Sequence, residues 1–164
     1  MRNKQKGFSL IELLIVVAII LIIAAIAIPN LIRSKMAANE ASAVATLRTI
    51  NTAEVVYSST YSVPALFGTL AQLGTNATPA TCAAGAPPPT SAAACLIDGA
   101  LESAGVVPGK SGYLLTLAVA TGGYASNNDP VSAGSTGVRH FYTDQSLVIR
   151  QNSTATAKST DSPI

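Results

Sequence analysis

The stretch Lys6–Ile28 reads KGFSLIELLIVVAIILIIAAIAI, and it contains the longest apolar run of the 164-residue chain. Nineteen of the 21 residues from Phe8 to Ile28 are apolar, and the two exceptions are Ser9 and Glu12. A helix rises about 1.5 Å per residue, so 21 residues reach about 31 Å, enough to cross the hydrocarbon core of a bilayer. The run therefore predicts one membrane-spanning helix.

The residues before this run are basic. Arg2, Lys4 and Lys6 precede it, and no acid occurs among the first eleven residues. Such flanks stay on the cytoplasmic side, which predicts an amino end inside the cell and a head outside the membrane. A cleaved secretory signal would have a shorter apolar core followed by a small-residue site, whereas this run ends at Pro29-Asn30. A plain membrane anchor is the alternative that stays open.

Glu12 is unusual for a plain anchor. A carboxylate within a membrane helix costs about 2–3 kcal/mol or more, so it marks a functional residue that needs a partner. The next basic residues are Arg33 and Lys35, 21 and 23 positions further along. We therefore expect the partner of Glu12 to come from another molecule.

The segment Lys6–Glu12 (KGFSLIE), followed by the apolar residues Leu13–Ile28, resembles the leader of type IV pilins and of the related type II secretion pseudopilins. The resemblance implies that a prepilin peptidase cuts between Gly7 and Phe8 and N-methylates the new amino group of Phe8. It implies that the apolar run is kept, first as a membrane anchor and then as the core of a filament. It also implies that Glu12 sets the register of assembly by pairing with the Phe8 amino group of an adjacent subunit.

Three segments follow from this resemblance. Residues 1–7 form a cleaved leader, residues 8–29 the transmembrane and filament-core half of a long helix, and residues 30–164 a soluble head. Removing the leader also removes three of the ten basic side chains, which leaves seven against eight acidic ones, a formal charge of −1 instead of +2. No nucleic-acid partner is expected, because the net charge is small and the sequence has no basic patch with interleaved aromatics.

Helical periodicity continues beyond the apolar run. One face at spacings near 3.6 carries Met36, Ala43, Leu47, Ile50, Tyr57 and Tyr61. This stripe predicts a single helix from about Phe8 to about Ser59, with its second half packed against the head. Pro29 lies inside this helix and predicts a kink or local unwinding just before it, around Ile26–Ile28. Many relatives carry a glycine beside the position of Leu21, and this chain does not.

Residues 75–95 form a proline-rich surface loop bracketed by Cys82 and Cys95. Two cysteines in a head outside the cytoplasm usually form a disulfide. The alternatives are a free thiol pair or a metal pair. No metal site is expected, because His140 is the only histidine and no CxxC spacing occurs. Calcium is weakly indicated at most, because the acidic residues of the later loops do not cluster.

The rest of the head reads as a short helical turn over Leu96–Glu102 followed by strands. The strands are expected at Tyr113–Val119, within Tyr124–Val131, at Val138–Thr143 and at Leu147–Arg150, with turn residues between them. The tail Gln151–Ile164 is rich in Ser and Thr and is expected to be frayed. With the resemblance, this pattern predicts an α+β type IV pilin fold, a long N-terminal helix packed on an antiparallel sheet of about four strands.

No enzyme motif occurs: the chain has no phosphate-binding glycine loop, no HExxH and no GxSxG. No cofactor is expected. The resemblance implies a structural subunit of a type IV pilus that moves from the inner membrane into an extracellular filament of identical subunits. Its other partners would be the prepilin peptidase, an assembly ATPase, a platform protein and a secretin. The alternatives are a major pseudopilin in a periplasmic pseudopilus and a membrane-anchored adhesin that does not polymerise.

Overall fold

The chain divides into two units, Met1–Lys35 and Met36–Ile164, and each is described by itself. The computed structural model describes residues 8–61, 67–75, 82–83 and 88–164. The predicted leader 1–7, with Gly7, lies outside the described residues, and so do residues 76–81 and 84–87 of the predicted loop.

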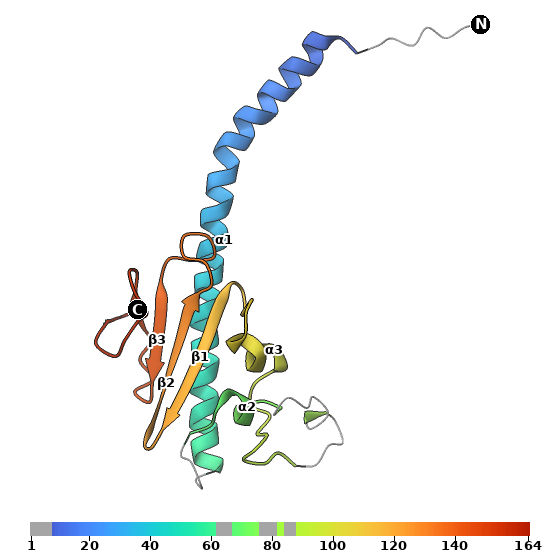
Figure 1. The fold of residues 1–164 in the computed structure, drawn as a ribbon. Helices are drawn as coiled ribbons and strands as arrows, with labels where there is room; N and C mark the ends of the chain where they lie inside the picture. The colour runs from blue at the N-terminus through green and yellow to red at the C-terminus, as the bar shows by residue number, and fades with distance from the viewer. Residues whose placement is uncertain (1–7, 62–66, 76–81, 84–87) are drawn as a thin grey trace, which may run out of the picture. The chain divides into compact units, whose positions relative to one another are not determined.

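The first helix, α1, runs from Leu10 to Thr60 and is 51 residues long (Figure 1). The long helix predicted from the apolar run and the stripe after it is therefore confirmed. Pro29 lies inside α1, and Ile26–Ile28 are helical, so the local unwinding expected there is wrong for the single chain. A proline removes only one hydrogen bond of the ladder, and the helical residues on both sides of it keep the rest.

The head contains a five-stranded antiparallel sheet (Figure 1). Its strands are β1 (Tyr113–Ala120), β2 (Gly123–Pro130), β3 (His140–Asp144), β4 (Arg150–Asn152) and β5 (Ser162–Pro163). The spatial order β1-β2-β3-β4-β5 equals the order along the chain, which makes the sheet a meander. The antiparallel α+β fold predicted from the sequence is confirmed, with one strand more than expected.

The C-terminal part of the sheet differs from the prediction. Strand β4 begins at Arg150, not at Leu147, because Leu147 has a φ of 63° and its N–H donates to the Asp144 carbonyl in a turn. The frayed tail predicted over Gln151–Ile164 is wrong as well. That tail completes β4, forms β5 and buries Ala157, which is 1% exposed.

The core lies between the second half of α1 and the sheet. Figure 1 shows β1, β2 and β3 lying across this half of the helix. The helix contributes Ala43, Leu47, Ile50, Ala53 and Tyr57, and the sheet contributes Tyr113, Leu115, Tyr124 and Phe141. The predicted stripe is thus the buried face of α1, with Tyr61 packed at its edge.

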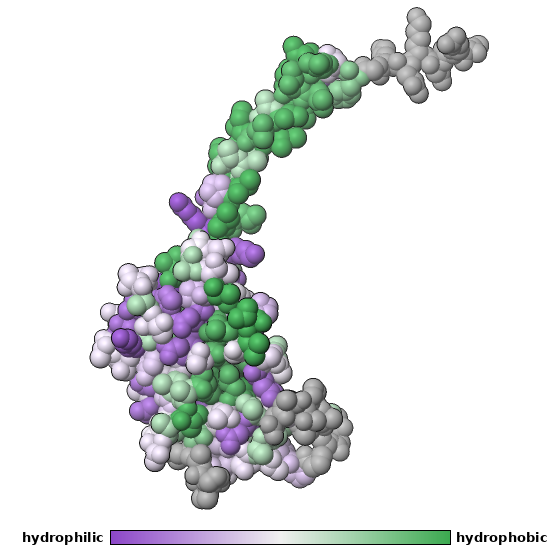
Figure 2. All heavy atoms as spheres, in the orientation of Figure 1, coloured by the Kyte–Doolittle hydropathy of each residue, from purple (hydrophilic) through white to green (hydrophobic). Residues whose placement is uncertain are grey.

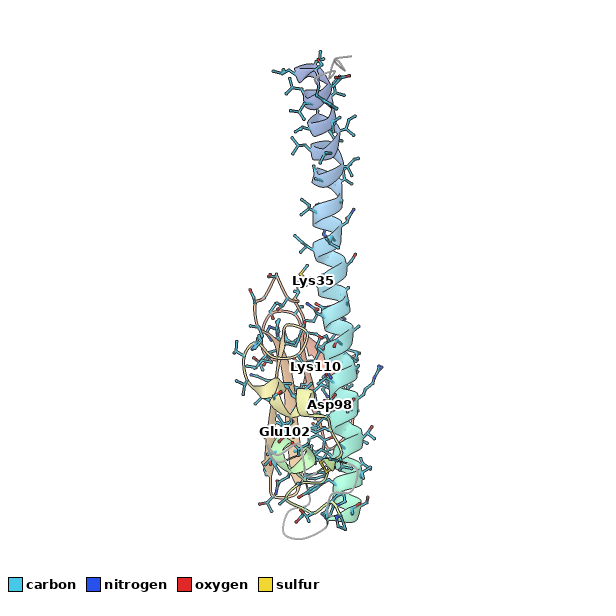
Figure 3. All side chains as sticks on the ribbon, turned by 90° about the vertical axis from the view of Figure 1, so that its right-hand side faces the viewer. Lys35, Asp98, Glu102 and Lys110 are labelled. Carbon is cyan, nitrogen blue, oxygen red and sulfur yellow. A yellow bond between two sulfur atoms is a disulfide. The ribbon has the colours of Figure 1, made fainter. Side chains whose placement is uncertain are left out.

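Short helices close the remaining side of the head. They are α2 (Leu70–Leu73), α3 (Gly99–Glu102) and the 3-10 turn η2 (Ser103–Gly105). Thr69 and Gln72 form a capping box at the start of α2, and Asp98 caps α3 by accepting from the Leu101 N–H. Figure 3 shows Asp98 and Glu102 at α3, where the sequence predicts a helical turn.

Candidate functional site

The apolar half of α1 has no covering within its own chain. Among the described residues, α1 is the one helix long and apolar enough to cross a membrane, and none of that apolar stretch is buried. Figure 2 shows the side chains of this half as a continuous hydrophobic surface, and Figure 3 shows them projecting on different sides of the helix. The most exposed of its aliphatic side chains include Leu10 at 75%, Leu31 at 69% and Ile26 at 65%. Such a helix is compatible with lipid or with neighbouring helices, but not with water.

Glu12 lies in the first turn of this helix. Its Oε2 accepts a hydrogen bond of 2.9 Å from the Ser9 N–H. Ser9 immediately precedes the helix and Glu12 is the third helical residue, so the two hold the positions of a capping box. Among the described residues, no cation forms an ion pair with Glu12. Among the described residues, the carboxylate therefore has one partner, the neutral Ser9 N–H.

The other predicted residues of the amino terminus have these positions. Phe8 is 79% exposed. It lies two residues before the start of α1, and four residues before Glu12 in the first turn of that helix. Gly7 lies outside the described residues, and cleavage after it, like methylation of Phe8, stays a prediction. Pro29 is inside the helix, and its role as a kink stays a prediction too.

The predicted disulfide is confirmed. Cys82 and Cys95 are bonded, with their Cα atoms 5.7 Å apart. The chain around Cys95 is attached to α2, because the Cys95 N–H donates to the Gly74 carbonyl and the Ala94 N–H donates to the Gln72 carbonyl. The disulfide thus fixes one side of the proline-rich loop to a structured part of the head.

Glu40 is a site residue that sequence reasoning missed. It accepts hydrogen bonds from the Val138 N–H at 3.0 Å, from the Arg139 N–H at 3.2 Å and from the Arg139 Nε at 2.8 Å. Burial acts to raise the pKa of this carboxyl, but the bonds from Val138 and Arg139 outweigh burial and hold the pKa below 4.5. Glu40 therefore ties the loop before β3 to the helix.

Asn51 and Glu54 lie further along the same buried face. The Asn51 Oδ1 accepts from the Tyr124 hydroxyl at 2.9 Å and from the Thr143 hydroxyl at 3.1 Å, so it joins α1 to two strands. Glu54 is 0% exposed and accepts from the Gly68 N–H at 2.9 Å. Helical spacing was the signal that could have identified Glu40 and Glu54 as buried residues. Both fall on the apolar stripe of α1 and interrupt it with carboxylates.

The acidic residues of the sheet have partners within the head. Asp129 Oδ1 lies 2.6 Å from His140 Nδ1 across the β2–β3 pair, and Asp144 accepts from the Ser146 N–H at 2.9 Å. Burial acts to raise the pKa of Asp144, but the bonds from Ser146 and Tyr142 hold it below its ordinary value. Within the described ranges, no three metal-ligating side chains gather.

Comparison with known proteins shows what the amino terminus of the chain is similar to. Residues 2–28 match the family model of the prokaryotic N-terminal methylation motif. The chain is 43% identical over 81 residues to a protein of Thermus thermophilus, the type IV wide pilus major component PilA4, a match that covers 49% of this chain and 61% of the relative. It is 49% identical over 51 residues to the type IV major pilin protein PilA of Myxococcus xanthus. That match covers 31% of this chain and 23% of the relative.

The chain thus spans less than two thirds of the length of either relative. No solved structure matches it significantly. The matched residues include the basic flank, Gly7, Phe8, Glu12 and the apolar run, on which the resemblance was based. The chain therefore carries the N-terminal methylation motif of prepilins on an α+β fold, and the relatives that it matches are type IV pilins.

Proposed function

We propose that the chain is a structural subunit of a type IV pilus that polymerises through the first half of α1. The observation that carries this proposal is the apolar helical stretch, which no described residue of the same chain covers and which begins beside a carboxylate. The relatives named as pilus components support the same function.

Glu12 gives the polymerisation its selectivity. When the helix leaves the bilayer, its apolar side chains exchange lipid for neighbouring helices, and this exchange is nearly neutral in apolar burial. The position of the subunit in the filament is then determined by side-chain packing and by charge pairing. Cleavage between Gly7 and Phe8 creates an amine that stays cationic after N-methylation, and Glu12 of an adjacent subunit pairs with it. A subunit out of register would leave a buried unpaired charge, at a cost of several kcal/mol.

Processing and export need other proteins. A prepilin peptidase removes residues 1–7 and methylates Phe8, and an assembly ATPase, a platform protein and a secretin move the subunit into the filament. The basic flank supports an initial position in the inner membrane with the amino end in the cytoplasm and the head outside. The assembled filament is extracellular.

Two other functions make different predictions. A pseudopilin of type II secretion is not favoured, because the relatives are named as pilus components. A membrane-anchored adhesin would keep its subunits in the membrane at every expression level. Electron microscopy of sheared surface filaments, with mass spectrometry of the amino terminus for methyl-Phe8, separates these functions. An unprocessed Met1 terminus without filaments would overturn the proposal.

The substitution Glu12→Ala tests the mechanism. We expect normal cleavage and methylation, but about a tenfold or greater loss of sheared filaments, because the Phe8 amine would be buried without a partner. Leu13→Ile is the matched control, since it changes the next residue and keeps the segment apolar, and it should leave the yield unchanged. Normal filament yield from Glu12→Ala would contradict the pairing.

A further inference from the structure

Glu54 is a fully buried carboxyl with half of its hydrogen-bonding capacity unused. Its side chain lies on the inner face of α1 and is 0% exposed. Oε2 accepts the hydrogen bond from the Gly68 N–H, whereas Oε1 has no hydrogen-bond partner among the described residues. A buried carboxylate is stable only when a cation or several donors compensate its charge.

The groups around Glu54 do not supply a cation. Tyr57, one turn further along α1, and Tyr124 from β2 are the ionisable neighbours, and burial followed by the charge of Glu54 raises the pKa of both phenols. Asp144 on β3 acts on Tyr124 in the same direction. Burial raises the pKa of Glu54 to about 7, although the bond from Gly68 lowers it. Among the described residues, the ionisable groups coupled to this carboxyl are therefore all acids.

The partner of Glu54 belongs to the segment Phe67–Thr75, which contains α2. The Phe67 ring packs on Tyr124 with centroids 5.0 Å apart. Gly68 is enclosed, because a Cβ at this position would lie 3.1 Å from Leu73 Cδ2 and 3.2 Å from Tyr57 Cε2. A released Gly68 would therefore disturb the packing of the whole segment on the helix.

The same segment holds the disulfide-bearing loop. The Leu73 carbonyl accepts from the N–H groups of Leu96 and Ile97, and the Gly74 carbonyl accepts from the Cys95 N–H. A movement of this segment would thus be transmitted to residues 94–97 through backbone hydrogen bonds.

We propose that loss of the Glu54 proton releases the segment Phe67–Thr75 from α1, so that this segment and the backbone of Cys95 bonded to it are held on the helix in mildly acidic surroundings and released as the pH rises. The neutral acid is compatible with the buried position. Among the described residues, the carboxylate has one hydrogen-bond donor and no cation near it. It would therefore become hydrated only if the segment Phe67–Thr75 moved away from α1. This inference does not depend on filament formation.

Hydrogen exchange of the Gly68 amide tests the proposal, measured on the full chain in detergent micelles and corrected for the intrinsic pH dependence of exchange. Opening exposes Glu54 and returns its pKa from about 7 to 4.5, so the protection factor of Gly68 should fall about 70-fold between pH 5 and pH 8. The Val138 amide is the internal control, because it donates to Glu40, whose pKa is lowered. Its protection should show no such fall.

Two further measurements complete the test. Glu54→Gln keeps a side-chain carbonyl for Gly68 and cannot lose a proton, so the 70-fold fall should disappear in this variant. Titration of the Glu54 carboxyl carbon by NMR in the unmodified chain gives an answer even if the variant does not fold. A midpoint near 4.5, or Gly68 protection that does not change with pH, would overturn the proposal.

Discussion

At the scale of single residues, Gly137 is required by a neighbouring side chain. A Cβ at this position would clash with the hydroxyl and ring of Tyr113, whose hydroxyl donates to the Arg139 carbonyl at 2.8 Å. Tyr113 is 1% exposed, and its ring packs on Phe141 with centroids 6.0 Å apart. Gly137→Ala should therefore destabilise the head by about 1–3 kcal/mol, as overpacked cores do. Chemical denaturation followed by circular dichroism measures this loss.

The control for that substitution is Gly99→Ala. Gly99 is in the first turn of α3, and a Cβ built on it would meet no described atom within 4 Å apart from those of its chain neighbours and the backbone of its own helix. Because alanine favours a helix over glycine, stability should stay the same or rise slightly. Equal losses from Gly99→Ala and Gly137→Ala would show that the contact with Tyr113 is not the cause.

The residues that could be predicted from the sequence are those whose environment is local. Leu47, Ile50 and Tyr57 recur at helical spacing, and all three are buried. The donors of Glu40 could not be predicted in this way, because Val138 and Arg139 lie 98 and 99 positions away in the chain. A carboxylate on an apolar stripe indicates that a partner exists, but not which residue it is.

At the scale of secondary-structure elements, the C-terminal tail belongs to the sheet. Ala157 is 1% exposed, and its carbonyl accepts from the Asn127 Nδ2 at 2.8 Å. Ala157→Asp would bury a charge without a partner and should destabilise the head by about 3 kcal/mol or more. Thermal unfolding of Ala157→Asp beside the exposed control Ala155→Asp measures the difference. Similar melting temperatures for the two variants would mean that the tail is frayed after all.

The elements differ in how far the sequence predicts them. Helix α1 and strands β1 to β3 have strong periodicity or turn residues at their ends. Strand β5 has neither, because it lies in a Ser- and Thr-rich tail. It is held by distant groups: the Arg150 side chain donates to the Asp161 carbonyl, and the Ile164 N–H donates to the Ile149 carbonyl. Such contacts exist only once the sheet has formed.

At the scale of the whole molecule, the proposed cleavage after Gly7 would change the charge. The 164-residue chain, with residues 1–7 present, has a formal charge of +2 and a pI of about 8.6. Loss of Met1–Gly7 removes Arg2, Lys4 and Lys6 and gives −1, and methylation of the Phe8 amine leaves its charge unchanged. Protein from filaments should therefore focus at a clearly more acidic pH than the unprocessed chain. Filament protein that focuses near 8.6 would show that the leader is retained.

The meander also determines how the head folds. Each strand pairs with the strand just before it in the chain, so each pairing closes a short loop at a small cost in entropy. Contacts between the helix and the sheet join distant residues, such as the Asn128 side chain and the Ala43 carbonyl, 85 positions apart. Folding rates fall as contacts become more distant in the chain. The strands should therefore assemble early, and docking of α1 should be the slow step of folding.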